Sequence, residues 1–297
     1  MKQSKYMGMA LLAAGLYALS APLAKLLLVG LSPVMMAGLL YAGAGLGMAL
    51  VALFRRRDSN QVRLPFSRAD RPYLILMVVL DVAAPILLLY GLRTTTAANA
   101  SLLNNFEIVA TSVIALLFFR ESISRRLWLG IALVTVASVL LSINDFASFR
   151  FSTGSLLILA AATCWGLENN CTRKLAVKDP LNVVIVKGVF SGAVSLIIAA
   201  ATGSFSTNFP LILAALGVGF IAYGLSIFFY VWAQRGLGAA KTSTYYAVAP
   251  FIGAGISIAI FRQWPGIAFF VALAVLIFGA YFTTTEAVHQ PKIELGK

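Results

Sequence analysis

Four ionisable side chains lie within long apolar stretches of the sequence: Asp81, Glu107, Glu168 and Lys187. A charge at membrane depth costs about 2.5–3.5 kcal/mol on insertion scales, so such groups normally face a protein interior or a water-filled cavity. A carboxylate there can bind a cation or exchange a proton. Each can instead serve only in an ion pair between helices. We expect the three carboxylates to line a cavity and do not count Lys187 among the site residues.

Other polar and aromatic residues accompany these charges at helical spacing. Trp165, Glu168 and Asn169 share one helix face, because they follow the i, i+3, i+4 pattern. We expect a central cavity to be lined by Tyr17, Ser20, Asp81, Ser101, Asn104, Glu107, Trp165, Glu168, Asn169, Tyr223, Ser243 and Tyr246. A mostly apolar wall with a few polar groups suits a small zwitterion or an aromatic or cationic solute. Core packing or an interfacial belt is the alternative role for each aromatic residue.

Three prolines fall inside the predicted helices. Pro22, Pro85 and Pro250 cannot donate a backbone hydrogen bond, so each frees the carbonyl four residues earlier. For Pro85 that carbonyl belongs to Asp81 itself. Freed acceptors at membrane depth are tolerated where they meet a cavity, water or a neighbouring helix. We expect these prolines to act as hinges or kinks, with a simple packing kink as the alternative.

The elements that carry these residues are apolar helices. Of the 297 residues 60% are hydrophobic and 11% are charged, which excludes an ordinary soluble domain. A spanning helix takes roughly 20 apolar residues. The apolar runs predict ten spans near 6–29, 33–54, 71–92, 98–119, 123–143, 153–173, 182–201, 211–234, 239–261 and 265–285. The prediction is therefore an all-α integral membrane protein.

The positive charge reports the orientation of these spans. If the N-terminus is cytoplasmic, 18 of the 23 basic residues fall in cytoplasmic segments and four on the opposite side. This bias obeys the positive-inside rule. We therefore expect a multi-pass protein of the bacterial inner membrane with both termini in the cytoplasm. The net charge of +13 then indicates topology, and no nucleic-acid partner is expected.

The second half of the sequence repeats the first at an offset of 142 to 148 residues. Tyr17 and Lys25, eight residues apart, recur as Trp165 and Arg173. The stretch from Arg93 through Ala98 to Ser101 recurs from Arg235 through Ala240 to Ser243, and Pro33 recurs as Pro180. The repeats are predicted as residues 1–147 and 148–297, the second including a short tail. Since each holds five spans, an odd number, the second must enter the membrane from the opposite side.

Inverted repeats of packed helices are typical of transporters, in which one half rocks against the other around a central site. Glycines in four predicted spans, among them Gly45, Gly188 and Gly192, are expected to let helices approach closely.

On these residues the sequence resembles the drug/metabolite transporter superfamily, in its EamA branch, and is most similar to the YddG-type amino-acid exporters. The supporting features are the 5+5 arrangement, the aromatic-plus-basic pairs of the first and sixth spans, and the Ala-x2-Ser motifs of the fourth and ninth. The resemblance implies that spans 5 and 10 pack peripherally while spans 1, 3, 4, 6, 8 and 9 surround the site. A Glu-Pro step of the family is split here between Glu107-Ile108 and Ala249-Pro250.

The residues needed for metal binding, nucleophilic catalysis or nucleotide binding are missing from the predicted spans. The single histidine, His289, lies beyond the last predicted span, so no metal site or serine–histidine nucleophile is expected at membrane depth. The sequence contains no phosphate-binding loop and no potassium-channel filter motif. We expect no enzyme activity, no cofactor and no metal. The expected partners are a small-molecule substrate and membrane lipid, with the protein acting as a monomer.

These observations predict a secondary transporter that exports small metabolites, in the first place amino acids, by alternating access. An exporter of organic cations is the alternative within transport. A non-transporting membrane scaffold is the alternative from another class.

Overall fold

The fold is built from apolar helices whose ends coincide with polar capping residues and prolines. A computed structural model describes residues 2–54, 66–119, 123–145, 150–175, 179–237, 242 and 245–289. Thr96, Ser124 and Asn208 each accept a backbone N–H at the start of a helix. Pro180 lies in the first turn of its helix, where its missing N–H is harmless.

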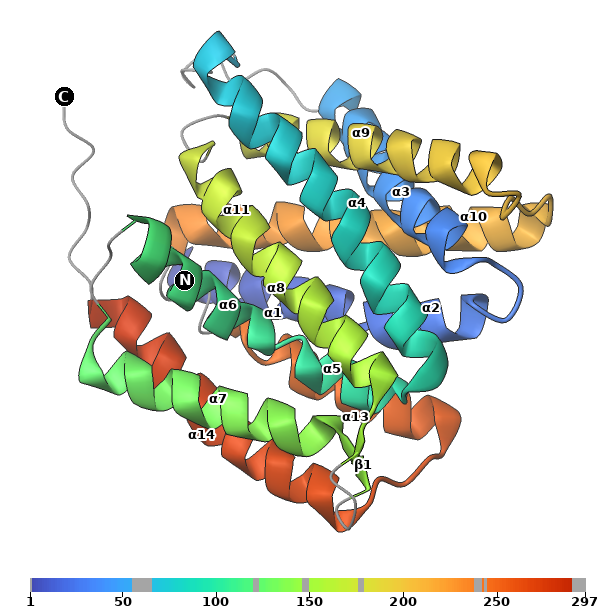
Figure 1. Ribbon diagram of the computed structural model, residues 1–297. Helices are drawn as coiled ribbons and strands as arrows, with labels where there is room; N and C mark the ends of the chain where they lie inside the picture. The colour runs from blue at the N-terminus through green and yellow to red at the C-terminus, as the bar shows by residue number, and fades with distance from the viewer. Residues whose placement is uncertain are drawn as a thin grey trace, which may run out of the picture.

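The helices and strands follow one another along the chain in this order, and most are labelled in Figure 1. The first half contains α1 (Lys2–Ala18), α2 (Ser20–Leu27), α3 (Pro33–Phe54), η1 (Arg68–Asp70), α4 (Arg71–Thr94), α5 (Ala97–Leu103), α6 (Phe106–Phe119) and α7 (Arg125–Ser142). The first half ends with β1 (Ile143–Asp145). The second half contains β2 (Arg150–Phe151), α8 (Thr153–Lys174), α9 (Pro180–Ala201), α10 (Phe209–Val218), η2 (Gly219–Leu225), α11 (Ser226–Leu237), α13 (Ala249–Phe261) and α14 (Ile267–His289).

The outer surface is that of a membrane protein. Seven helical segments of the described chain are long and apolar enough to cross a bilayer, and two shorter apolar helices cover 249–261 and 267–283. Large apolar side chains such as Ile197 and Phe278, exposed by 67% and 62%, cover the outside. Helix α8 is not among these seven segments, because its sequence contains several polar residues. Two of them, Glu168 and Asn170, are nevertheless buried inside the bundle. The predicted helical membrane character is confirmed.

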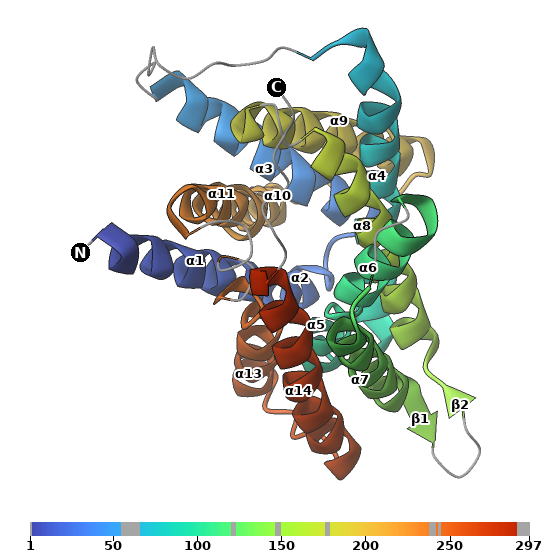
Figure 2. The ribbon, with the colours of Figure 1, turned by 90° about the vertical axis from the view of Figure 1, so that its left-hand side faces the viewer.

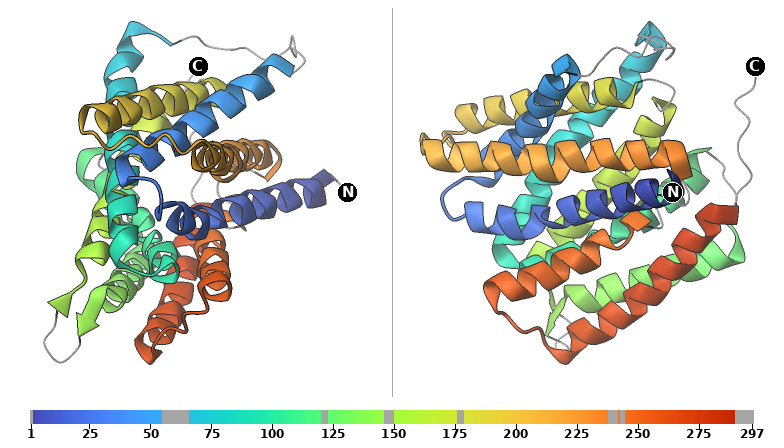
Figure 3. Two further views of the ribbon diagram at one scale, coloured as in Figure 1. Left: turned by 90° about the vertical axis from the view of Figure 1, so that its right-hand side faces the viewer. Right: turned by 180° about the vertical axis from the view of Figure 1, so that it is seen from behind.

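Helices from the two halves pack against each other in reciprocal pairs. Helix α3 packs on α9 at one side of the bundle, and α7 packs on α14 at the other (Figure 2). Helix α4 packs on α8 and, in the corresponding way, α11 packs on α1; the latter two run side by side in Figure 3. In terms of the predicted spans, these four contacts join spans 2 and 7, 5 and 10, 3 and 6, and 1 and 8. If each span is replaced by its counterpart in the other half, the same four pairs result.

Two predicted spans are interrupted, the first near Pro22, where a hinge or kink was expected, and the fourth where the sequence indicated a continuous helix. The first is broken at Leu19, since Pro22 has no N–H to donate to the carbonyl of Ala18. The fourth is broken at Asn104 and Asn105, where the Asn105 side chain donates to the carbonyl of Leu102 and competes with helical bonding.

The eighth predicted span carries one π-helical segment, η2, between α10 and α11. Such segments are frequent at functional sites. A further departure from an all-α chain is the short antiparallel pair β1–β2, which joins α7 to α8 and pairs Ile143 with Phe151.

Glycines bring α3 and α9 into backbone contact. A Cβ added to Gly45 would lie 2.5 Å from the amide nitrogen of Val189, and one added to Gly192 would lie 2.6 Å from that of Ala42. Neither backbone can move aside without shifting a helix. The expected close approach at these glycines is confirmed, and it holds α9 at a set depth and rotation against α3.

We expect Gly45→Ala to lower the thermal stability of the purified protein, because the new methyl group meets the backbone of α9. Overpacking of this kind costs about 1–3 kcal/mol. The matched control is Gly255→Ala in α13, where a Cβ meets nothing within 4 Å. Thermal unfolding in detergent checks both variants, and equal melting temperatures would contradict the close contact.

Candidate functional site

The centre of the bundle holds one half-buried lysine between two buried carboxylates. Lys187 on α9 places its Nζ 3.2 Å from Asp81 Oδ2 on α4 and 3.1 Å from Glu168 Oε2 on α8. The Asp81 and Glu168 side chains are exposed by 0% and 2%, and that of Lys187 by 16%. We call these three residues the Lys187 cluster. Because it is enclosed by apolar helices, each charge depends on the others for compensation.

Neighbouring side chains hold the two carboxylates in place. The Tyr41 hydroxyl donates to Asp81 Oδ1 at 2.8 Å and accepts from Trp165 Nε1 at 3.3 Å. The Thr172 hydroxyl donates to Glu168 Oε1 from one turn further along α8. Each carboxylate therefore has a hydrogen bond of its own besides the contact with Lys187.

A second polar group lies beside the cluster, where α6 packs on α8. Asn169 donates to Glu107 Oε1 at 2.6 Å and to the Thr111 hydroxyl at 3.4 Å. Glu107 is close enough to interact electrostatically with both Glu168 and Lys187. The third predicted carboxylate thus faces the same interior as the Lys187 cluster.

Aromatic rings connect this charged region to the opposite side of the bundle. The Tyr223 ring centroid lies 5.7 Å from that of Tyr41 and 6.0 Å from that of Tyr17. The Tyr17 ring in turn lies 5.8 Å from that of Tyr246, whose hydroxyl is 3.3 Å from the Ser226 hydroxyl. Tyr223 comes from η2, so the π-helical segment helps to direct this ring inward.

Beyond Tyr17 is a small pocket where the broken spans meet α13. Its lining includes Tyr17, Ser20, Ser101, Asn104 and Pro250. The buried Asn104 Oδ1 has no hydrogen-bond partner among the residues that the structure describes. The pocket has room for about one water molecule, which is enough to satisfy that oxygen but not to hold a metabolite.

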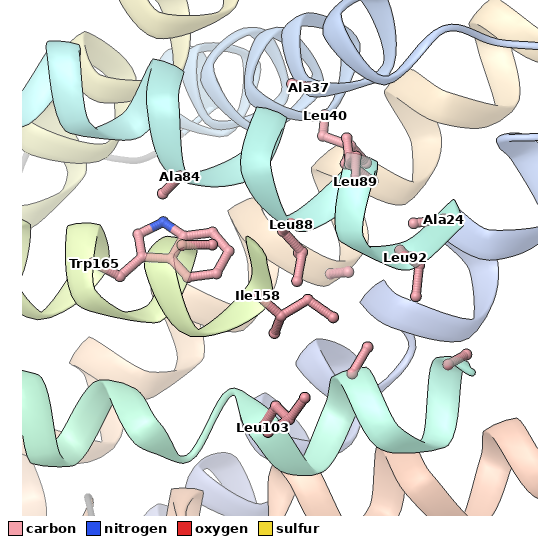
Figure 4. Packing of buried hydrophobic residues seen from close by; sticks show 14 of the residues in the cluster. Ala24, Ala37, Leu40, Ala84, Leu88, Leu89, Leu92, Leu103, Ile158 and Trp165 are labelled. Carbon is pink, nitrogen blue, oxygen red and sulfur yellow. The ribbon is translucent and has the colours of Figure 1, made fainter. Parts of the chain in front are cut away.

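An apolar cluster packs close to a lysine at the C-terminal end of α4. Figure 4 shows Leu88, Leu92, Leu103 and Ile158 packed together beyond Trp165, and all four are buried. Next to Leu92, the Lys25 ammonium binds carbonyl oxygens at the C-terminal end of α4, including that of Thr95 at 2.7 Å. A cation suits this position because the last carbonyls of a helix carry partial negative charge.

The residues predicted to line a cavity therefore fall into connected groups. Asp81, Glu168 and Trp165 belong to the Lys187 cluster and its surroundings, and Glu107 and Asn169 lie beside it. Tyr17, Tyr223 and Tyr246 form the aromatic connection, whereas Ser20, Ser101 and Asn104 lie around the small pocket.

The remaining predictions concern Ser243 and the prolines. Ser243 lies outside the described residues. Pro250 is in the first turn of α13, and Pro85 lies inside the unbroken helix α4.

Sequence reasoning missed Tyr41, and it recognised Lys187 as an ionisable group at membrane depth without placing it in the site. Lys187 was not included in the site because the sequence of one apolar helix does not indicate which carboxylates on other helices its lysine contacts. Tyr41 lies between glycines and apolar residues, with no polar neighbour at helical spacing. The excess of carboxylates over basic groups deep in the predicted spans was the available signal for Lys187.

We expect Tyr41→Phe to destabilise the protein, because it removes the donor to Asp81 Oδ1 in a buried site. Leaving such an acceptor unsatisfied costs about 1–3 kcal/mol. Tyr90→Phe on α4, where the tyrosine is 43% exposed, is the matched control. The check is thermal unfolding in detergent, and equal losses in the two variants would argue against the hydrogen bond.

Comparison with known proteins agrees with this architecture. The chain is 31% identical over 265 residues to an uncharacterized transporter of Methanothermobacter thermautotrophicus, covering 83% of this chain and 76% of the relative. It is 28% identical over 235 residues to the uncharacterized transporter YyaM of Bacillus subtilis, covering 74% of each. A crystal structure of another protein covers 97% of this chain and 100% of its own, with a TM-score of 0.68 and 18% identity, which shows the fold alone.

A family model assigns the chain. The model of the EamA-like transporter family matches two stretches, residues 4–143 and 152–285, which together make up most of the sequence. The finding agrees with the helical membrane fold and with the transporter relatives. The chain belongs to the EamA-like transporter family.

Proposed function

We propose that this chain is a secondary transporter that exports amino acids, aromatic ones included, across the bacterial cytoplasmic membrane by alternating access. The observation that carries the proposal is the Lys187 cluster, which places charges of both signs deep inside an apolar bundle. Ionisable groups in such a position mark substrate and ion pathways. An amino acid carries one ammonium and one carboxylate, so it offers a partner for each sign of charge in the cluster.

The tyrosines support an aromatic side chain as part of the substrate. Tyr223 and Tyr17 lie between the charged cluster and the small pocket, and their rings already contact each other edge to face. Aromatic rings gain about 0.5–1.5 kcal/mol from such pairs beyond the area they bury. A site with a charged end and an aromatic wall fits an amphiphilic metabolite.

Alternating access is supported by the arrangement of the helices. We propose ten spans in two inverted repeats of five, with both termini cytoplasmic. The reciprocal contacts between halves and the two stretches matched by the family model support this arrangement. In that orientation Lys25 and the apolar cluster next to it lie toward the outer face of the membrane.

Transport is tested with purified protein in proteoliposomes. We expect uptake of L-phenylalanine, L-threonine or L-alanine, and a loss of at least about tenfold, equal to 1.4 kcal/mol, in Glu168→Gln and Trp165→Ala. These variants remove a charge of the cluster and the donor to Tyr41. The matched control is Trp128→Ala on α7, where the side chain is 47% exposed.

The same assay separates the proposal from its alternatives. The cluster carries one more carboxylate than ammonium, which is the observation that favours an exporter of organic cations as a second candidate. Uptake of methyl viologen without any amino-acid flux would select that candidate. Normal expression with full flux in both site variants would show that the cluster is structural and would contradict the proposed site.

A further inference from the structure

Lys187 is the accessible member of its cluster. Its side chain is 16% exposed, whereas those of Asp81 and Glu168 are exposed by 0% and 2%. The lysine side chain is therefore the part of the cluster that reaches furthest toward the surface. A positively charged group that is to reach the carboxylates must take the place of Lys187.

The carboxylates do not depend on Lys187 for their orientation. Tyr41 holds Asp81 through Oδ1, and Thr172 holds Glu168 through Oε1, so the oxygens that face Lys187 are the other ones. Moreover, Asp81 Oδ2 forms an ion pair with Lys187 without a well-aligned hydrogen bond among the described residues. The two carboxylates form a fixed pair of acceptors with one oxygen each directed at a replaceable ammonium.

The backbone that carries Lys187 is fixed, but its side chain is not. The neighbouring Gly188 packs against the backbone of α3, with the carbonyl oxygen of Tyr41 2.8 Å from where a Cβ would lie. A lysine side chain has four flexible carbons and a compact ammonium that can turn to new partners. The ammonium can thus leave the carboxylates without any movement of α9.

We propose that Lys187 occupies the site of the substrate's ammonium group, and that a primary ammonium on the substrate displaces it from Asp81 and Glu168. The released Lys187 then pairs with the substrate's carboxylate. This inference rests on the proposed function and deepens it, because it names the chemical groups that are recognised: a primary ammonium with a carboxylate beside it.

The donor count explains why a primary ammonium is preferred. Such a group has three N–H donors, the same number as lysine, and can bind two carboxylate oxygens at once. A quaternary ammonium has no donor and would leave both oxygens without a hydrogen bond. Exchange of one ammonium for another also leaves the charge of the carboxylate pair compensated throughout.

The test measures binding of two probes to purified protein in detergent by titration calorimetry. Phenethylammonium carries only the ammonium, whereas L-phenylalanine carries both charged groups on a similar frame. For Lys187→Met we expect phenethylammonium to bind at least about tenfold more tightly, because its internal competitor is gone. We expect L-phenylalanine to bind at least about tenfold more weakly than phenethylammonium in the same variant, because its carboxylate has lost its partner.

An unequal response of the two probes to Lys187→Met, with the gain confined to phenethylammonium, is the decisive result, since a merely structural lysine would affect both alike. Equal changes for both probes, no change, or no binding of either probe to wild type and variant would overturn the inference. Lys5→Met at the exposed start of α1 is the matched control and should leave both affinities unchanged.

A second comparison covers the case in which Lys187→Met does not fold with two uncompensated carboxylates. Asp81→Asn is then compared with Asp81→Asn/Lys187→Met, in which Glu168 alone remains charged. Removal of the lysine should again favour phenethylammonium over L-phenylalanine, and an unchanged ratio of affinities would overturn the inference. The binding assay is independent of the proteoliposome assay. If the affinities change as expected but no flux is measured, the transporter proposal alone is contradicted. If flux is measured but the affinities of the two probes change equally, the role of Lys187 alone is contradicted.

Discussion

The contact between Lys187 and the carboxylates of Asp81 and Glu168 is the interaction on which the interior of this protein depends. Removing one partner from a buried ion pair costs about 3–5 kcal/mol, since the remaining charge is left without compensation. The three residues come from α9, α4 and α8, so this contact links helices from both halves of the chain. The surrounding apolar helices lower the local dielectric constant and thereby strengthen the attraction between these charges.

Such a contact needs helices that approach closely and helices that are interrupted. The glycines of α3 and α9 set the position of Lys187, because their backbones touch where a larger residue would separate them. The interruptions near Leu19 and Asn104 produce the opposite effect, since they leave a small polar pocket instead of a filled interior. The helices are therefore tightly packed beside the Lys187 cluster and less tightly packed next to Tyr17, where the pocket lies.

Corresponding positions of the two matched stretches carry different chemistry. Asp81 corresponds to Tyr223 at an offset of 142 residues, and Glu168 corresponds to Ser20 at an offset of 148. One side of the centre is therefore charged, while the other presents an aromatic ring and a hydroxyl. A scaffold with reciprocal helix contacts in this way carries an asymmetric set of polar side chains at its centre.

The sequence by itself determined the helical membrane character, the family and the residue types available for a site. Apolar length, charge position and repeated motifs are local properties of the chain, so they can be read without knowing which helices touch. Helical spacing also placed Trp165, Glu168 and Asn169 on one face. Only the tertiary structure brought Lys187 and Tyr41 to Asp81, because periodicity describes one helix at a time, whereas this contact depends on how glycine contacts and helix breaks set several helices against one another.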